Sequence, residues 1–190
     1  MVALGLSVTC ALAMANGAFV GVEGDYSFSS KLKPKDNDSV KKGQFGLGLK
    51  AGYDFDIARV YGSYVYDFQA KKALGDEYGT VVKWNTHNFI IGADYTPTIA
   101  QDFKLILGGY TGYSRLNLKV SDKEGGTEKG NANGWILGAK IGGEYALDAH
   151  NAVEFGIKAD RTDYGKIDKF EIKDIKETNV GLYLGYTYKF

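Results

Sequence analysis

Apolar residues recur at every second position over several separate stretches of this chain. The clearest stretch is residues 180–190, where one face is apolar or aromatic and the other is small or polar. The first face consists of Val180, Leu182, Leu184, Tyr186, Tyr188 and Phe190, and the second of Gly181, Tyr183, Gly185, Thr187 and Lys189. Two residues is the side-chain period of a β-strand, so each such stretch predicts a strand with one apolar face and one polar face.

Eight stretches carry this pattern, and the segments between them alternate in length. The predicted strands centre on residues 18–28, 45–55, 59–69, 89–95, 103–113, 135–145, 153–159 and 180–190. Three connections are short (55–58, 97–101 and 148–151) and four are long and polar (29–42, 70–83, 119–132 and 163–177). Short and long ends then lie on opposite sides of the sheet. This order predicts an all-β fold, with eight antiparallel strands running up and down within one domain.

The position of the apolar face separates two kinds of barrel. A soluble sandwich or lipocalin-like barrel buries this face, whereas a transmembrane barrel turns it toward lipid and can keep a polar lumen. Here the opposite face carries charges in mid-strand, such as Glu23, Lys50, Lys140 and Lys158, among glycines that leave room for them. Tyrosine and phenylalanine gather near strand ends, as in interfacial girdles. These features favour an eight-stranded transmembrane β-barrel, and the soluble fold remains the alternative.

The amino terminus has a different composition from the rest of the chain. Residues 1–22 contain no charged side chain, and Val2–Ala15 are apolar or small. This length suits a secretory signal peptide and is too short to span a bilayer as a helix. We expect cleavage after Ala15, or alternatively after Gly17, which leaves 16–190 as the barrel. The only cysteine, Cys10, is then removed, as suits export to an oxidising compartment.

Overall composition excludes several classes of function. The 23 basic and 23 acidic residues balance, so the broad basic surface of a nucleic-acid-binding protein is not expected. With two histidines and no cysteine after cleavage, we expect no metal site and no cofactor. Neither His87 nor His150 has a local serine partner that would indicate hydrolysis, so we do not expect an enzyme.

The chain resembles the small eight-stranded bacterial outer-membrane barrels, a family that includes the OmpA membrane domain, OmpX and the opacity-type proteins. The resemblance covers nearly the whole sequence. Its carboxy-terminal aromatics Tyr186, Tyr188 and Phe190 resemble the signal read by the barrel-assembly machinery. The resemblance implies the outer membrane of a Gram-negative bacterium, with termini and short turns on the periplasmic side and four long loops outside. We expect a monomer that contacts outer-membrane lipid and lipopolysaccharide.

The polar face of the predicted strands supplies the candidate site, a network of charges inside a narrow barrel. Eight strands enclose room for side chains or one small ligand, so inward charges should pair with one another. The predicted inward network consists of Glu23, Asp25, Lys50, Asp54, Arg59, Asp67, Asp94, Lys140, Glu144, Glu154, Lys158 and Asp160.

Hairpin geometry predicts some of the pairs in this network. A four-residue turn at 55–58 sets Asp54 opposite Arg59. In the hairpin around 148–151, a turn centred on Ala149 would oppose Lys140 to Lys158 and Glu144 to Glu154. A turn centred on His150 instead opposes Lys140 to Asp160. We predict the second register, because it avoids two like-charge contacts.

On adjacent strands, Glu23 and Lys50 lie at similar heights, which predicts a salt bridge between them.

Two functions fit these features. The first is a structural or adhesion-type role, in which the external loops bind a host or surface ligand because a rigid barrel presents them. The loop at 29–42 holds five lysines against two aspartates, which favours anionic lipopolysaccharide or surface polymers. The alternative is a narrow pore, or small-solute channel, through the polar lumen.

Overall fold

The computed structural model describes most of the chain beyond the amino terminus. The described residues are 17–33, 40–74, 80–121, 126–165 and 175–190. The predicted signal peptide and its cleavage point after Ala15 lie outside them. The described part contains no helix that is long and apolar enough to cross a membrane.

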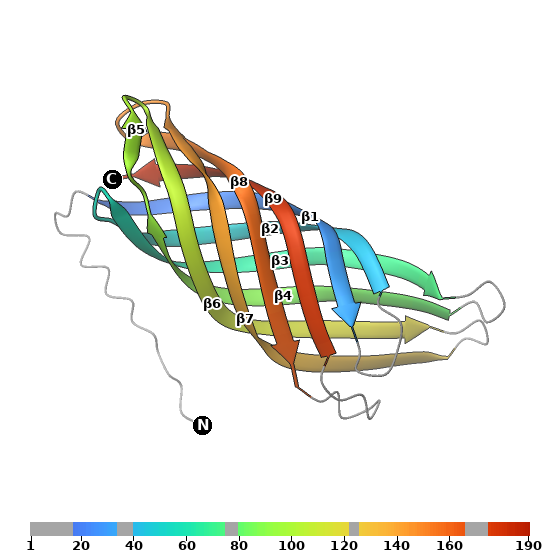
Figure 1. Cartoon of the computed structure of the whole chain (residues 1–190). Coiled ribbons are helices and arrows are strands. Elements are labelled where there is room, and N and C mark those ends of the chain that lie inside the picture. The colour runs from blue at the N-terminus through green and yellow to red at the C-terminus, as the bar shows by residue number, and fades with distance from the viewer. Residues whose placement is uncertain (1–16, 34–39, 75–79, 122–125, 166–174) are drawn as a thin grey trace, which may run out of the picture.

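Nine strands form one antiparallel sheet (Figure 1). They are β1 (Ala18–Lys33), β2 (Val40–Asp54), β3 (Ala58–Leu74), β4 (Thr80–Tyr95), β5 (Thr98–Ala100), β6 (Phe103–Ser121), β7 (Thr127–Ala146), β8 (Asn151–Tyr164) and β9 (Ile175–Lys189). Each long strand pairs with its neighbour in sequence, β9 returns to β1, and β4 pairs with β6. These pairings close an eight-stranded barrel, so the predicted fold class is confirmed.

Two details of the connections differ from the prediction. The short connection at 97–101 contains β5, which pairs with the start of β6. The strands also continue well into the predicted long loops, since β6 and β7 are 19 and 20 residues long and pair as far as Ser121 and Thr127. Backbone pairing continues past the bilayer, where water replaces lipid and the apolar alternation that marked the strands stops.

The apolar face points outward, which excludes the soluble alternative. Ile91 and Leu137 are each 66% exposed, and Leu184 is 62% exposed. Backbone pairing also aligns Tyr64, Phe89, Tyr113 and Trp135 in one row across β3, β4, β6 and β7. A band of exposed aliphatic residues bordered by aromatics is the surface of a membrane-spanning barrel.

Glycines on the inner face make room for large inward side chains. A Cβ on Gly92 would lie 2.4 Å from the ring of Tyr61, and a Cβ on Gly138 would lie 2.2 Å from the ring of Tyr110. Both tyrosines are buried. The lumen is therefore filled by tyrosine rings and paired polar groups.

Placing a charge in the lipid-facing band should destabilise the barrel. Leu182→Arg should lower the free energy of unfolding by about 2–4 kcal/mol, because the guanidinium enters hydrocarbon. Thr178→Arg is the matched control on the same face of β9, four residues nearer its outer end, and should cost about 0–1 kcal/mol. Urea unfolding in phospholipid vesicles, followed by heat-modifiable migration on a denaturing gel, measures both. Equal effects at the two positions would contradict the assignment of the lipid face.

Candidate functional site

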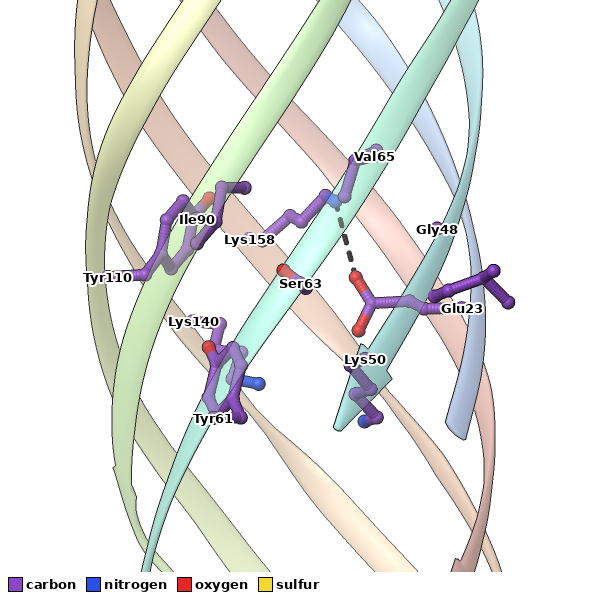
Figure 2. Close-up of a pocket in the computed structure, with 11 residues that line it drawn as sticks. Glu23, Gly48, Lys50, Tyr61, Ser63, Val65, Ile90, Tyr110, Lys140 and Lys158 are labelled. Atoms are coloured by element: carbon purple, nitrogen blue, oxygen red, sulfur yellow. Dashed lines mark hydrogen bonds and ion pairs between the residues drawn. The ribbon is translucent and has the colours of Figure 1, made fainter. Parts of the chain in front are cut away.

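Charged and polar side chains fill the lumen at three levels along the barrel. The middle level centres on Lys158 of β8, whose Nζ lies 2.9 Å from Asp25 Oδ2 and 3.3 Å from Glu23 Oε1, both on β1. Figure 2 shows Lys158 reaching Glu23 across the lumen. On the other side, Asp160 accepts hydrogen bonds from the Tyr110 hydroxyl at 3.0 Å and from Asn179 Nδ2 at 3.1 Å.

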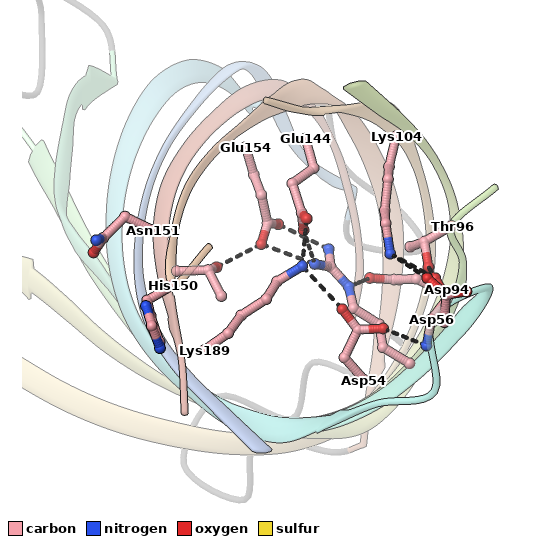
Figure 3. A network of polar contacts seen from close by, with 12 residues as sticks. Asp54, Asp56, Asp94, Thr96, Lys104, Glu144, His150, Asn151, Glu154 and Lys189 are labelled. Atoms are coloured by element: carbon pink, nitrogen blue, oxygen red, sulfur yellow. Dashed lines mark hydrogen bonds and ion pairs between the residues drawn. The ribbon is translucent and has the colours of Figure 1, made fainter. Parts of the chain in front are cut away.

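The level nearest the short turns centres on Arg59 of β3, which is 1% exposed. Its Nε donates to Asp94 Oδ2 at 2.6 Å and its Nη1 to Glu144 Oε2 at 2.9 Å. Nη1 also donates to Glu154 Oε1 at 2.9 Å, and Nη2 donates to Glu154 Oε2 at 2.8 Å. One planar guanidinium therefore joins β3 to β4, β7 and β8. Figure 3 shows the partner carboxylates Glu144 and Glu154 pointing into the lumen.

Three lysines complete this level. Lys50 Nζ lies 2.7 Å from Glu154 Oε2, and Lys140 Nζ lies 3.0 Å from Asp94 Oδ2. Lys189 Nζ lies 2.6 Å from Glu144 Oε1 and 3.0 Å from Asp54 Oδ2. Four cations thus meet four carboxylates here, namely Arg59, Lys50, Lys140 and Lys189 with Asp54, Asp94, Glu144 and Glu154. This end of the lumen is electrically balanced.

The outermost level consists of hydrogen bonds between acidic and neutral side chains. Asp67 accepts from the Thr86 hydroxyl and from Asn88 Nδ2. The Tyr164 hydroxyl donates to Glu177 Oε2 at 2.8 Å. All twelve residues of the predicted network lie in these three levels.

Several side chains that fill the lumen lie outside the predicted network. Glu177 and Tyr164 fall in the predicted loop at 163–177, and Lys189 lies on the predicted polar face but is not among the twelve residues of the predicted network. The signal for Glu177 was present, because it continues the polar-face parity of Gly181 and Asn179 on β9.

The predicted register of the hairpin around 148–151 is wrong. Lys140 pairs with Lys158, and Glu144 pairs with Glu154. The like charges are tolerated because their partners come from other walls of the barrel: Arg59 bridges the two glutamates. The two lysines turn to different carboxylates, Lys140 to Asp94 and Lys158 to β1.

Of the two other predicted pairs, one is confirmed and one is wrong. Asp54 does lie opposite Arg59 in the β2–β3 register, as predicted, although their ion pairs are with other residues. The predicted Glu23–Lys50 salt bridge is wrong, because Glu23 pairs with Lys158 and Lys50 with Glu154. The β1–β2 register sets Glu23 opposite Gly48, one step of side-chain alternation away from Lys50.

Little space remains between these groups. Two inner cavities of about 30 and 20 Å³ lie beside Lys158, one lined by Glu23 and Lys50 and the other by Asp67 and Glu177. Each holds on the order of one water molecule. Among the described residues, no group of three or more His, Cys, Asp and Glu is arranged to hold a metal ion.

The periplasmic end carries the remaining predicted features. Tyr186, Tyr188 and Phe190 are exposed on the lipid side of β9. His150 stacks on Tyr188 with ring centroids 6.0 Å apart. In the same turn, hydrogen bonds from the His150 backbone N–H and the Asn151 side chain lower the pKa of Asp148. His87 lies on the outer wall, with its Nδ1 2.7 Å from the Tyr64 hydroxyl.

Comparison with known proteins places this arrangement in context. The family model described as "Outer membrane protein beta-barrel domain" matches residues 1–190. Neisserial surface protein A has a similar structure at 19% identity, with a TM-score of 0.61 over 92% of this chain and 97% of that one. The attachment invasion locus protein Ail of Yersinia pestis is similar at 19% identity, with a TM-score of 0.57 over 93% of this chain and 100% of that one. The outer membrane protein OprG from Pseudomonas aeruginosa is similar at 16% identity, with a TM-score of 0.52 over 92% of this chain and 96% of that one. No curated protein sequence matches the chain.

Removing the central guanidinium should destabilise the barrel strongly. Arg59→Met leaves three buried carboxylates without their shared partner and should lower the free energy of unfolding by about 3–5 kcal/mol. The matched control is Arg161→Met, which removes an exposed guanidinium paired with Asp163 at 3.3 Å and should cost about 0–1 kcal/mol. Urea titration in vesicles measures both, and an unchanged midpoint for Arg59→Met would contradict the central role of this network.

Proposed function

Because the chain belongs to the outer membrane protein β-barrel family and resides in the Gram-negative outer membrane, we propose that it is a structural and surface-interaction barrel whose extracellular part does the binding. The observation that carries this proposal is the filled lumen. Arg59 and its carboxylates occupy the barrel cross-section near the short turns, and the two cavities further along the lumen, beside Lys158, measure only about 30 and 20 Å³.

A solute path through this lumen would require the network to separate. The Arg59 guanidinium holds carboxylates from three other strands, and Glu154 is fully buried against both Arg59 and Lys50. Breaking a buried pair of this kind costs about 3–5 kcal/mol, and the open state would have to break several at once. This cost favours a permanently closed plug over a small-solute channel.

The external part of the barrel is more accessible to a ligand than the filled lumen. The β2–β3 register ends at Gly46–Asp67. The β7–β8 register runs to Gly134–Tyr164 and one further backbone hydrogen bond, from the Gly165 N–H to Asn133 O, where the description of this part of the chain stops; the other strand pairs continue outward. Beyond this level the described strands pair in two sets, β3, β4, β6 and β7 in one and β8, β9, β1 and β2 in the other, which we call the outer sheets; residues 166–174, which follow β8, lie outside the described part. Figure 1 shows these two groups diverging at the end that carries the long connections. Polar sheets of this kind can present binding groups at the cell surface.

We propose two further partners and no catalytic role. Exposure of Tyr186, Tyr188 and Phe190 beside lipid supports recognition of this strand by the barrel-assembly machinery. Lipopolysaccharide is the expected neighbour of the outer wall. The described contacts of His87 and His150 are with aromatic rings, a tyrosine hydroxyl and the 148–151 turn, which gives no support to hydrolysis.

Planar-bilayer recording and surface binding together test the proposal. Refolded protein should give no stable conductance steps. Bacteria displaying it should bind surface polymers or cells, and should lose this binding when residues 34–39 and 166–174 are replaced by Gly-Ser segments. The matched control is the same replacement at 98–101 on the periplasmic side, which should leave binding intact.

The opposite result has an equally clear form. Stable conductance that changes on Lys50→Ala or Glu23→Ala would support the narrow pore and reject the proposal, because both residues line the lumen.

A further inference from the structure

A row of lysines crosses the outer sheet of β3, β4, β6 and β7. Backbone pairing sets Lys83 of β4 opposite Lys119 of β6, and Lys119 opposite Lys129 of β7. Lys71 of β3 occupies the next place in the same register, opposite Lys83. One basic residue on each of four adjacent strands, all at the same level, is an unusual arrangement because like charges directly opposite one another are destabilising.

The row faces away from the lumen. Side chains alternate along each strand, and the neighbours Trp84, Leu116 and Ala132 are buried on the inner side. The odd-numbered residues of β4, β6 and β7 therefore form the outer wall. The side chains of Lys83 and Lys119 are partly exposed there, and that of Lys129 is exposed. We call Lys83, Lys119 and Lys129 the lysine ladder.

No acidic partner offsets this charge within the described part of the chain. Neither the lysine ladder nor Arg115 makes an ion pair there. The two outer-wall rows below the ladder are Asn85–Asn117–Asn131 and His87–Arg115–Asn133. The other outer sheet differs, because Asp163 accepts from Arg161 and lies opposite Lys176.

The distance of the lysine ladder from the aromatic row shows where it lies relative to the membrane. Phe89, Tyr113 and Trp135 form the aromatic row that marks the outer interface. Arg115 lies two residues beyond this row, and the ladder lies six residues beyond it, which is roughly 20 Å along the strand and roughly 15 Å in height after strand tilt. This is the zone of large glycolipid headgroups beside the barrel.

We infer that the outer wall of β4, β6 and β7 binds the phosphate-bearing headgroup of glycolipid in the outer leaflet. Arg115 contacts anionic groups nearest the acyl chains, and the lysine ladder contacts those further out. The inference rests on the proposed function, and it names membrane glycolipid as the partner of this wall. The wall faces sideways and continues the lipid-facing surface, from the aromatic row past Arg115 to the lysine ladder, so a glycolipid lying beside the barrel can contact both levels of charge.

Titration in bicelles tests the inference directly. Refolded full-length protein in zwitterionic phosphocholine bicelles is titrated with purified lipopolysaccharide and, separately, with the same material after dephosphorylation. The amide NMR signals of β4, β6 and β7 report binding. Phosphorylated material should shift them and dephosphorylated material should not. K119Q/K129Q should weaken binding by about 25-fold, since each lysine near an anionic surface contributes about a factor of five.

The matched control is R161Q/K176Q, which removes two cations from the other outer sheet, where Asp163 already faces both. It should change affinity less than about twofold, on the small contribution expected of exposed ion pairs. Equal binding by wild type and K119Q/K129Q, or equal binding of phosphorylated and dephosphorylated material, would overturn the inference. So would a preference of the ladder for a soluble sulfated polysaccharide over the glycolipid.

Failure here is distinguishable from failure of the proposed function. Unchanged glycolipid binding in K119Q/K129Q, with bilayers still silent and hairpin-dependent adhesion intact, would reject only the glycolipid site. Stable conductance through the lumen would reject the proposed function, whatever the outcome of the titration.

Discussion

The Arg59 guanidinium in contact with three buried carboxylates is the interaction on which the interior of this barrel depends. Lipid gives a strand no hydrogen-bonding partner, so the sheet must close on itself. Closing eight strands leaves a lumen too narrow for bulk water. Every charge that alternation directs inward must then find a partner across the lumen. Arg59 provides this for Asp94, Glu144 and Glu154, and the lysines around it balance what remains.

Alternation along single strands was sufficient to predict most of the fold. It gave the eight long strands, the faces that meet lipid and lumen, and the Asp54–Arg59 register across a tight turn. Ion pairing could not be predicted in the same way, because hairpin reasoning compares only adjacent strands. Glu144 and Glu154 look incompatible as neighbours, and only the arrival of Arg59 from the far wall makes their pairing favourable. The shear of the barrel, which brings Arg59 to the height of Glu144 and Glu154, cannot be predicted from any single hairpin.

The same reasoning explains the strand ends that the sequence did not reveal. Lipid forces one face to be apolar, so strands are readable where they cross the bilayer. Beyond Trp135 and its row the outer face meets water instead of lipid, and β7 continues through Lys129 with no apolar period. Residues there look like a polar loop while their backbones remain paired. The predicted loops therefore include Glu177, Lys119 and Lys129, although these residues hold fixed positions in the sheet.

Charge is distributed differently inside and outside the barrel, and this difference favours the outer wall as the place where binding occurs. The charges around Arg59 balance one another and are mostly buried, so they have little free energy to offer a ligand. Lys119 stands between Lys83 and Lys129 and makes no ion pair with the described residues. An anion that bridges such a row removes a repulsion already present in the folded protein and adds an attraction of its own. Lysines that make no ion pair in the free protein gain the most electrostatic free energy when an anion binds, whereas the paired charges of the lumen gain none.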